Sequence, residues 1–449
     1  MILLRRLFIA LFASAIPASA LATLPEAFRA DGLLYPEEVF PALQSLLRDA
    51  ARHSPEIGIL QQRITEREGN LLVADSHRRF RVDANARVLG AYEMREDIPD
   101  RFRGAFNANT LVSRPLYHWG RLENQSAIGE LALEAAHLNF ERGSREHLHA
   151  VRVHYLQWVH QHERLAKARR STSLLEQLTA AEERQLEAGR STENAVIDLR
   201  ARLAESIEFV AFIERETLHQ RQTLERLTGS RDLAEPSTGA GLDFTPMTLA
   251  NIERLQRRFA LLPPENTPTV RLEETLREIE DRRYQIAERN RYPRLDFVAG
   301  VLTDQLDAFD SSDFALRIQY FAGVQVSWNI FDGGRTRGEK MAALARRRIH
   351  DLQAEGQRFR LDAETERIFA DIEFAVKQFS ARATRADLAR RRLDLIQRQV
   401  ADNLATETQR IEAELELAER NLRVGESRVQ YLLALAQLAS LHFPDPAAR

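Results

Sequence analysis

Two long stretches of this chain contain no proline. None occurs between Pro115 and Pro236 or between Pro293 and Pro444, whereas prolines gather between positions 236 and 268. Because a proline inside a helix costs about 3 kcal/mol, both stretches can form long helices, and the segment between them is predicted to be a linker. The chain is also 29% charged and only 7% aromatic, a composition that favours long helices over a compact globule. We therefore expect two helical halves.

The two halves also resemble each other in sequence. Placing Gly120 on Gly334 gives an offset of 214 positions that continues without a gap for about 110 positions. Upstream, an offset of 213 places Pro55 on Pro268. We predict an internal two-fold repeat in which each half contains a helix, two strands joined by a loop, and two long helices joined by a turn.

Four segments alternate apolar and polar side chains with the period of two that indicates half-buried strands. They are predicted at 80–92, 106–117, 294–303 and 315–330. Each is about ten residues or slightly longer, enough to cross a bilayer core when tilted, with lipid on the apolar face and water on the other. An ordinary half-buried sheet is the alternative. Four such strands in an exported chain, with two of them passing directly into long helices, favour a membrane barrel.

The N-terminus carries an export signal. Arg5 and Arg6 precede an apolar run and then the small residues around Ala20 and Ala22, which predicts a secretory signal peptide at 1–22. No later segment is apolar over the roughly 20 residues that a helical span needs, so we expect this chain to cross a membrane only with strands. The absence of cysteine excludes disulfides and a lipidated N-terminal Cys. A net charge of -3 gives no electrostatic argument for nucleic-acid binding.

The long helical stretches carry narrow apolar stripes of the kind that pack against neighbouring helices. One stripe steps by three or four residues through Val196, Leu199, Leu203 and Ile207. A helix from about 120 to 187 would be roughly 100 Å long at 1.5 Å per residue, which suits the wall of a tube. Gly189 and Asn403 are predicted to end these helices, because both residue types tolerate the left-handed conformation. Thr192 and Thr406 can cap the helices that follow.

No common catalytic or nucleotide-binding motif occurs, and we expect neither enzyme activity nor a cofactor. HExxH, GxSxG, P-loop and dinucleotide patterns are absent. Five histidines lie close together, but neighbours two positions apart on a helix point in different directions, so we interpret them as solvated helix positions and not as a metal site: His147, His149, His154, His160 and His162. Four aspartates are interpreted as a solvated loop and not as a calcium site: Asp304, Asp307, Asp310 and Asp313.

The duplicated order of elements and three segments resemble the TolC-like outer-membrane efflux protein family. The segments are YPRLDFVAGV (292–301), WNIFDGGRTRGE (328–339) and LEAGRSTENAVIDLRARLAE (186–205), and the resemblance extends over about 40 to 443. It implies an α+β membrane protein that forms a homotrimer. Each subunit would contribute four transmembrane strands to a twelve-stranded barrel. The barrel would continue into an α-helical coiled-coil tunnel in the periplasm, with an equatorial domain around the middle of the tunnel.

This interpretation divides the chain into six parts. They are a signal peptide (1–22), an N-terminal periplasmic segment (23–52), a first repeat (53–228, with its helical hairpin at 120–228), an equatorial linker (229–266), a second repeat (267–442, with its hairpin at 333–442) and a C-terminal tail (443–449). Gly120, Gly333 and Gly334 would turn barrel strands into tunnel helices.

The resemblance also implies a function and its partners. The chain would be the outer-membrane channel of a tripartite export system in a Gram-negative-type bacterium, a passive exit duct for small molecules that works with an inner-membrane transporter and a periplasmic adaptor. The outer-membrane duct of a type I protein secretion system is the alternative. A periplasmic coiled-coil scaffold without a pore is the rival of a different class.

Two groups of residues are assigned by the same resemblance. The hairpin ends would contact the adaptor, through Gly189, Arg190, Ser191 and Thr192 and through Asn403, Leu404, Ala405 and Thr406. Family members constrict the periplasmic end with acidic residues just beyond the second hairpin turn. The matching positions are Gln409 and Glu412, with Asp198 in the first half. Only Glu412 keeps the acid in the second half.

Overall fold

The computed structural model describes residues 26–95, 98–231, 246–307 and 314–448, and positions 233, 236 and 244. The predicted signal peptide and two of the loop aspartates, Asp310 and Asp313, lie outside the described residues. The chain forms two compact units. We call them the hairpin unit (Met1–Leu60, Phe140–Thr267 and Arg358–Arg449) and the sheet unit (Gln61–Asn139 and Pro268–Gln357). Each unit combines segments from both halves of the sequence, so the compact units do not follow the division into repeats.

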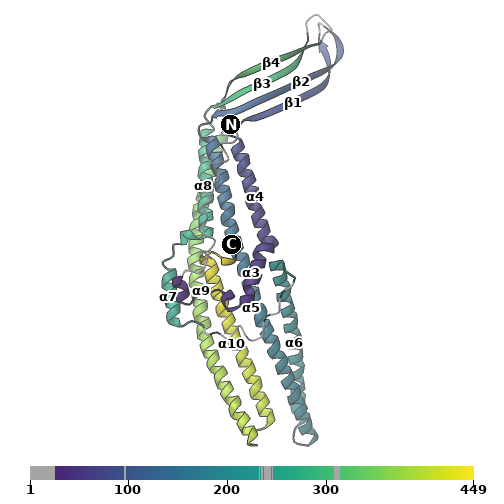
Figure 1. Cartoon of the computed structure of the whole chain (residues 1–449), viewed down its shortest axis with the longest axis vertical. Coiled ribbons are helices and arrows are strands. Elements are labelled where there is room, and N and C mark those ends of the chain that lie inside the picture. The colour runs from purple at the N-terminus through teal and green to yellow at the C-terminus, as the bar shows by residue number, and fades with distance from the viewer. Residues whose placement is uncertain are drawn as a thin grey trace, which may run out of the picture. The chain divides into compact units, whose positions relative to one another are not determined.

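The sheet unit contains a four-stranded antiparallel sheet with the strand order β1-β2-β3-β4 (Figure 1). The strands are β1 (Arg81–Arg95), β2 (Ile98–Tyr117), β3 (Arg294–Asp307) and β4 (Phe314–Ser327). Helices α4 (Pro55–Ser76) and α8 (Pro268–Arg289) precede the two strand pairs, and each contains 22 residues.

Four predicted strand ends are wrong. β1 ends at Arg95 and not at 92, and β3 ends at Asp307 and not at 303. β2 begins at Ile98 and not at 106, because its backbone remains paired with β1 through this stretch although the side chains do not alternate clearly. β4 ends at Ser327 and not at 330. The partner of Ser327 is Arg294, and the residue before Arg294 is Pro293, which has no N–H to continue the ladder. Trp328 instead donates its indole N–H to the carbonyl of Arg291 at 3.0 Å.

The strand register sorts the side chains of the sheet onto two faces. Paired residues share a face, and the alternation along each strand then defines an apolar face. Its members are Val82, Ala84, Ala86 and Val88 of β1, Phe106, Ala108, Thr110 and Val112 of β2, Leu295, Phe297, Ala299 and Val301 of β3, and Ile318, Tyr320, Ala322, Val324 and Val326 of β4. The opposite face is largely polar and includes Asp83, Asn85, Arg87, Asn109, Ser113, Asp296, Gln319, Gln325 and Ser327. In the part of the chain that the structure describes, β1 and β4 each have one unpaired edge.

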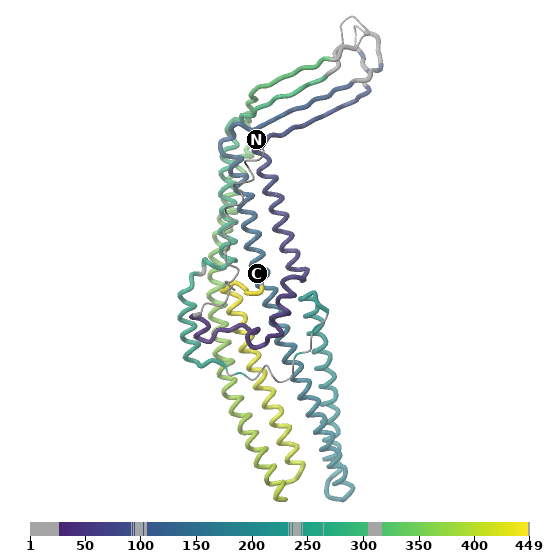
Figure 2. The backbone as a smooth tube through the Cα atoms, in the orientation of Figure 1, coloured from purple at the N-terminus to yellow at the C-terminus, as the bar shows by residue number. Residues whose placement is uncertain are grey.

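Four long helices form two helical hairpins that lie side by side in the hairpin unit (Figure 2), and the first helix of each hairpin begins in the sheet unit. They are α5 (Arg121–Glu187), α6 (Glu193–Thr228), α9 (Arg335–Ala401) and α10 (Glu407–His442). The first helix of each hairpin contains 67 residues and the second contains 36. Leu174, Leu175 and Leu178 of α5 pack against Ile411 of α10 and join the two hairpins. Among the described residues, no helix has both the length and the apolar character needed to span a membrane.

The main core of the hairpin unit lies where shorter segments cover the long helices. These segments are α1 (Glu26–Ala30), α2 (Pro36–Val39), α3 (Pro41–His53), α7 (Leu249–Phe259) and η2 (Pro446–Ala448). The short helix η1 (Pro264–Asn266) follows α7 and contributes no residue to this core. Phe259 of α7 makes edge-to-face contacts with Phe28, Phe369 and Phe443. Segments from the beginning, middle and end of the sequence are therefore packed into one cluster.

A buried cation is part of this cluster. Arg152 on α5 is fully buried, and its guanidinium binds Glu37 of α2, with Nη2 and Oε1 2.6 Å apart. It also binds Asp445 near the C-terminus, which is fully buried as well, and it lies over the ring of Tyr35. A buried charge is stable only when it is paired. Burial of Arg152 on α5 therefore requires the carboxylates of Glu37 and Asp445 beside it. This requirement holds the N-terminal segment and the C-terminal tail on α5.

The interpretation of the clustered histidines as solvated positions was wrong for at least one of them. His147 is buried, with Nδ1 2.5 Å from Oε2 of Glu56 and Nε2 2.9 Å from the carbonyl oxygen of Leu227. Desolvation also lowers the pKa of His149, His160 and His442 to about 4. Both broad faces of α5 are covered in this region, which the sequence of α5 alone does not reveal.

These three histidines predict a loss of stability in acid. Their pKa is about 4 in the folded chain, below the ordinary value of 6.5, so the unfolded chain takes up more protons as the pH falls from 6.5 to 4. The free energy of unfolding should therefore decrease through this window by roughly 1 kcal/mol per pH unit for each histidine. Urea unfolding of the purified protein at pH 7, 6 and 5 measures this slope.

A matched pair of variants isolates the contribution of one histidine. His442→Gln should reduce the slope, whereas His219→Gln, at an exposed position on α6, should leave it unchanged. Equal slopes for the wild type and His442→Gln would contradict the assignment.

Candidate functional sites

The first hairpin reverses through a left-handed glycine. Gly189 has φ +68°. Its N–H donates to the carbonyl of Leu186 at 2.9 Å, and the N–H of Arg190 donates to that of Gln185 at 2.8 Å. This pair of bonds is the Schellman motif, which satisfies the last carbonyls of α5. Thr192 then caps α6 by accepting a hydrogen bond from the N–H of Ala195 at 3.3 Å.

The second hairpin uses the same motif with asparagine in place of glycine. Asn403 has φ +60°, and its N–H donates to the carbonyl of Val400 at 3.1 Å. The N–H of Leu404 donates to the carbonyl of Gln399 at 2.7 Å. The departure from glycine therefore leaves the backbone geometry of the turn intact, because asparagine tolerates this conformation.

Gln409 has a structural role at the start of α10. Its backbone N–H donates to Oγ1 of Thr406 at 3.3 Å, and its side-chain Oε1 accepts from the N–H of Thr406 at 3.0 Å. These reciprocal bonds form a capping box. The Thr-x-x-Gln spacing at 406–409 is the sequence signal for this box, and our assignment of Gln409 from the family resemblance alone overlooked it.

The hairpin ends present polar surface with one apolar side chain. Leu404 is 78% exposed, and Arg190, Thr192 and Asn403 are exposed as well. Around Gly189 the space is open, because an added Cβ would meet no atom within 4 Å. Ser191 is half-buried and donates a hydrogen bond to Glu182. Each tip is therefore fixed by its own backbone and caps and leaves Leu404 free for contact.

Glu412 differs from the other acidic residues of the first half of α10. Its neighbours pair with arginine: Glu407 with Arg410, Glu414 with Arg170 and Arg410, Glu416 with Arg392 and Arg420, and Glu419 with Arg423. Glu412 is exposed and forms no hydrogen bond or ion pair with the described residues, and the same is true of Asp198 on α6. Glu412 therefore carries a negative charge that the described part of the chain leaves unpaired.

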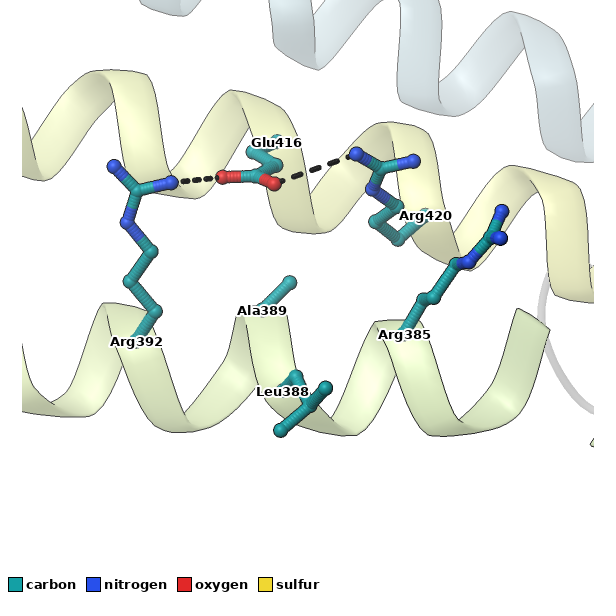
Figure 3. A pocket seen from close by; sticks show the side chains of 6 residues that line it. All are labelled: Arg385, Leu388, Ala389, Arg392, Glu416 and Arg420. Atoms are coloured by element: carbon teal, nitrogen blue, oxygen red, sulfur yellow. Dashed lines mark hydrogen bonds and ion pairs between the residues drawn. The ribbon is translucent and has the colours of Figure 1, made fainter. Parts of the chain in front are cut away.

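A shallow pocket of about 410 Å³ lies between α9 and α10. Its lining includes Leu388 and Ala389, and the carboxylate of Glu416 lies between the guanidinium groups of Arg392 and Arg420, at 2.6 and 3.5 Å (Figure 3). Arg385 extends from α9 toward the same gap (Figure 3). Three guanidinium groups and one carboxylate give the pocket a positive charge. None of the residues assigned from the sequence lines it.

The passage from β4 to α9 is organised by an aspartate and two glycines. Gly333 and Gly334 have φ +63° and +90°. The carboxylate of Asp332 accepts from the N–H groups of Thr336 at 2.9 Å and Gly334 at 3.0 Å. Hydrogen bonding with Thr336 and with the backbone lowers the pKa of Asp332. The aspartate in FDGG therefore caps the first turn of α9, a role that its position before a helix could have indicated.

The passage from β2 to α5 is held by residues from the other half of the chain. Gly120 has φ +73°, and its carbonyl accepts from Nη1 of Arg289 at 3.1 Å. His118 Nε2 lies 2.7 Å from Oδ1 of Asp296, at the beginning of β3. These contacts join the passage from β2 to α5 to the passage from α8 to β3 within the sheet unit. Among the described residues, no three or more His, Asp or Glu side chains form a group able to hold a metal ion.

Residues 265–442 match the family model described as outer membrane efflux protein. The second half of the chain is therefore similar to outer membrane efflux proteins. The resemblance to the TolC-like family is thereby confirmed. No curated protein shows significant sequence similarity to the chain.

Solved structures of outer-membrane proteins share the fold. The outer membrane protein VceC of Vibrio cholerae has a TM-score of 0.69 and 17% identity, over 89% of this chain and 96% of that one. The CmeC outer membrane channel of Campylobacter jejuni has a TM-score of 0.74 and 11% identity, over 90% and 86%. The MtrE outer membrane channel of Neisseria gonorrhoeae, in its open state, has a TM-score of 0.68 and 15% identity, over 89% and 88%. Because the similarity covers most of the chain, the first half shares the fold as well.

Proposed function

We propose that this chain is the outer-membrane channel of a tripartite export system, a passive exit duct for small molecules in a Gram-negative-type bacterium. It works with a periplasmic adaptor and an inner-membrane transporter, and it is not lipidated. The observation that carries the proposal is the four-stranded sheet with one apolar face, one largely polar face and two unpaired edges. This is the surface pattern of a barrel wall with lipid outside and water inside.

Closure of the barrel requires other copies of the chain. Unpaired N–H and C=O groups in lipid cost several kcal/mol each, so neither edge of the sheet is stable there alone. Pairing β1 of one copy with β4 of the next removes both edges, and three copies would give the twelve-stranded barrel that the resemblance implies. The equal lengths of the long helices in the two hairpins support an internal two-fold repeat. The hairpins would form the wall of the periplasmic tunnel.

The proposed activity is transport without catalysis. The description of the matched domain, efflux, favours small-molecule export over the duct of a type I secretion system. Single-channel conductance of the purified trimer in a planar lipid bilayer tests the duct, together with heat-modifiable trimers in outer-membrane fractions. A periplasmic scaffold would give neither conductance nor heat-modifiable trimers.

The two faces of the sheet predict opposite effects of an added arginine. Ala322 lies on the apolar face in the middle of β4, opposite Ala299, so Ala322→Arg should destabilise the barrel by about 2 to 4 kcal/mol. Gln325→Arg, on the polar face of the same strand, should be tolerated because water surrounds it there. The yield of heat-modifiable trimer in the outer membrane measures both. Similar yields would show that the faces are assigned wrongly.

The hairpin ends are the proposed adaptor contact. Leu404→Glu should abolish export, because a charged side chain at an apolar contact loses its water without gaining a partner. Heat-modifiable trimers should remain, because the Leu404 side chain is exposed and its backbone forms the turn. Export of a fluorescent dye from cells that contain the cognate transporter and adaptor measures the effect. Leu261→Glu, at a leucine that is 83% exposed outside the tips, is the control and should export normally. Normal export by Leu404→Glu would refute this contact.

Glu412 is the proposed gate residue, with Asp198 and Gln409 as the other assigned positions. In a trimer, three unpaired carboxylates around one axis would attract cations. Glu412→Ala should therefore lower the cation-to-anion permeability ratio, measured from the reversal potential in a salt gradient. Glu419→Ala removes the same charge from the same helix, but that carboxylate is already paired with Arg423 at 2.7 Å, so its effect should be smaller. Equal ratios for wild type and Glu412→Ala would exclude a gate at this position.

A further inference from the structure

The apolar face of the sheet carries a charged side chain, that of Arg114. Arg114 of β2 pairs with Phe297 of β3 and so belongs to this face. It is exposed and forms no ion pair with the described residues. Its guanidinium instead lies 4.7 Å from the centre of the Phe80 ring. The position is the third residue before Tyr117, where β2 ends, so this charge lies near one end of the face and not in its middle.

Aromatic residues gather at the same end of the sheet. A register shift between Pro115 and Tyr117 places Tyr117 opposite Leu295, on the apolar face. The rings of Tyr117 and Trp119 are 4.9 Å apart, and Trp119 stacks on Tyr292 at the same distance. A second exposed arginine, Arg291, lies beside these rings.

Arg291 is exposed and lies over the Tyr292 ring, with 4.9 Å between guanidinium and ring centre. Its Nη2 donates to the Tyr292 hydroxyl at 2.8 Å. Like Arg114, it forms no ion pair among the described residues. We call this group the basic-aromatic belt: Phe80, Arg114, Tyr117, Trp119, Arg291 and Tyr292.

The chemistry of the belt defines its ligand. An arginine on a lipid-facing strand costs about 2 to 4 kcal/mol at the bilayer midplane but only about 0 to 1 near the interface. The ring beneath each planar guanidinium supports it, and apart from the bond from Arg291 Nη2 to the Tyr292 hydroxyl the N–H groups remain available in a geometry that matches a phosphate.

The nearest acidic residues of the strands, Asp83 and Asp296, belong to the polar face. Glu288, the acidic residue that acts on Arg291, is paired with Lys340 at 3.3 Å, so among the described residues neither arginine has an ion-pair partner. A ligand that contacts both an apolar face and two guanidinium groups needs acyl chains and a phosphate.

We propose that the basic-aromatic belt binds the phosphate of an anionic glycerophospholipid at the edge of the bilayer. The inference rests on the membrane barrel proposed above and adds a lipid preference to it. Arg114 and Arg291 supply the phosphate contacts. Tyr117, Trp119 and Tyr292 supply the amphipathic rings that are stable at the level of the headgroups.

Native mass spectrometry of the detergent-purified trimer can test the preference. The trimer is titrated with dioleoylphosphatidylglycerol and, in parallel, with dioleoylphosphatidylcholine. Wild-type protein should bind the anionic lipid more tightly. Arg114→Gln and Arg291→Gln should each weaken that binding about fivefold, since a basic side chain near an anionic lipid surface contributes on the order of 1 kcal/mol.

Arg87 provides the matched control. It is an exposed arginine of β1 on the polar face of the same sheet, so Arg87→Gln should leave phosphatidylglycerol binding unchanged. Equal binding of the two lipids by wild type would overturn the proposal. So would Arg114→Gln and Arg291→Gln variants that bind like Arg87→Gln, or binding of lipid A without binding of phosphatidylglycerol.

Insertion into vesicles distinguishes failure of the lipid-binding proposal from failure of the proposed membrane channel. The wild type should float with phosphatidylcholine vesicles and conduct ions across a bilayer of that lipid. If it does both and shows no preference for phosphatidylglycerol, only the lipid site is refuted. If it neither floats nor conducts, the barrel proposal fails.

Discussion

Backbone hydrogen bonding is the constraint on which the architecture depends. The long helices satisfy their own N–H and C=O groups, and the Schellman motifs and caps at Gly189 and Asn403 satisfy most of those left at the turns. The sheet cannot do the same, because one edge of β1 and one edge of β4 have no partner in the described chain. A helical hairpin can therefore be complete within one copy. The sheet becomes complete only through association, and this difference makes the sheet the origin of the proposed trimer.

Charge pairing along α10 narrows the choice of gate residue in a way that sequence matching does not. Glu414, Glu416 and Glu419 each lie beside an arginine, so their fields are largely cancelled at short range. Gln409 uses its side chain to cap the helix. What remains is Glu412. Arg385, Arg392 and Arg420 line the same pocket as Glu416 and give it an excess of positive charge, so ions that approach α10 meet charges of both signs. Selectivity would then depend on the order of these charges along the helix more than on their sum.

The sequence predicted features that depend on neighbouring residues better than contacts between residues far apart in the chain. The absence of proline and the spacing of apolar residues predicted long helices, because these features act within a few turns. The alternation of 315–330 predicted a strand but could not reveal that Pro293, just before the partner strand β3, ends the pairing. The bonds from Arg152 to Glu37 and Asp445 join residues 115 and 293 positions apart. No pattern along the chain marks such partners, and for the same reason the burial of His147 was missed. The Thr-x-x-Gln cap at 406–409 was visible in the sequence and could have been predicted.

Equivalent positions of the two halves are 213 residues apart before the strand loops and 214 apart after them. The position of this change shows where the alternation of the strands tolerates an inserted residue. Val82 and Leu295 are 213 positions apart, as are Val88 and Val301, and all four lie on the apolar face. Phe106 and Tyr320 are 214 apart, as are Val112 and Val326, and they lie on the same face. The second half therefore has one residue more between Val301 and Tyr320 than the first half has between Val88 and Phe106. An insertion within a paired strand would move every following side chain to the opposite face. Between the strands it leaves both faces intact, and each half keeps its own passage from strand to helix.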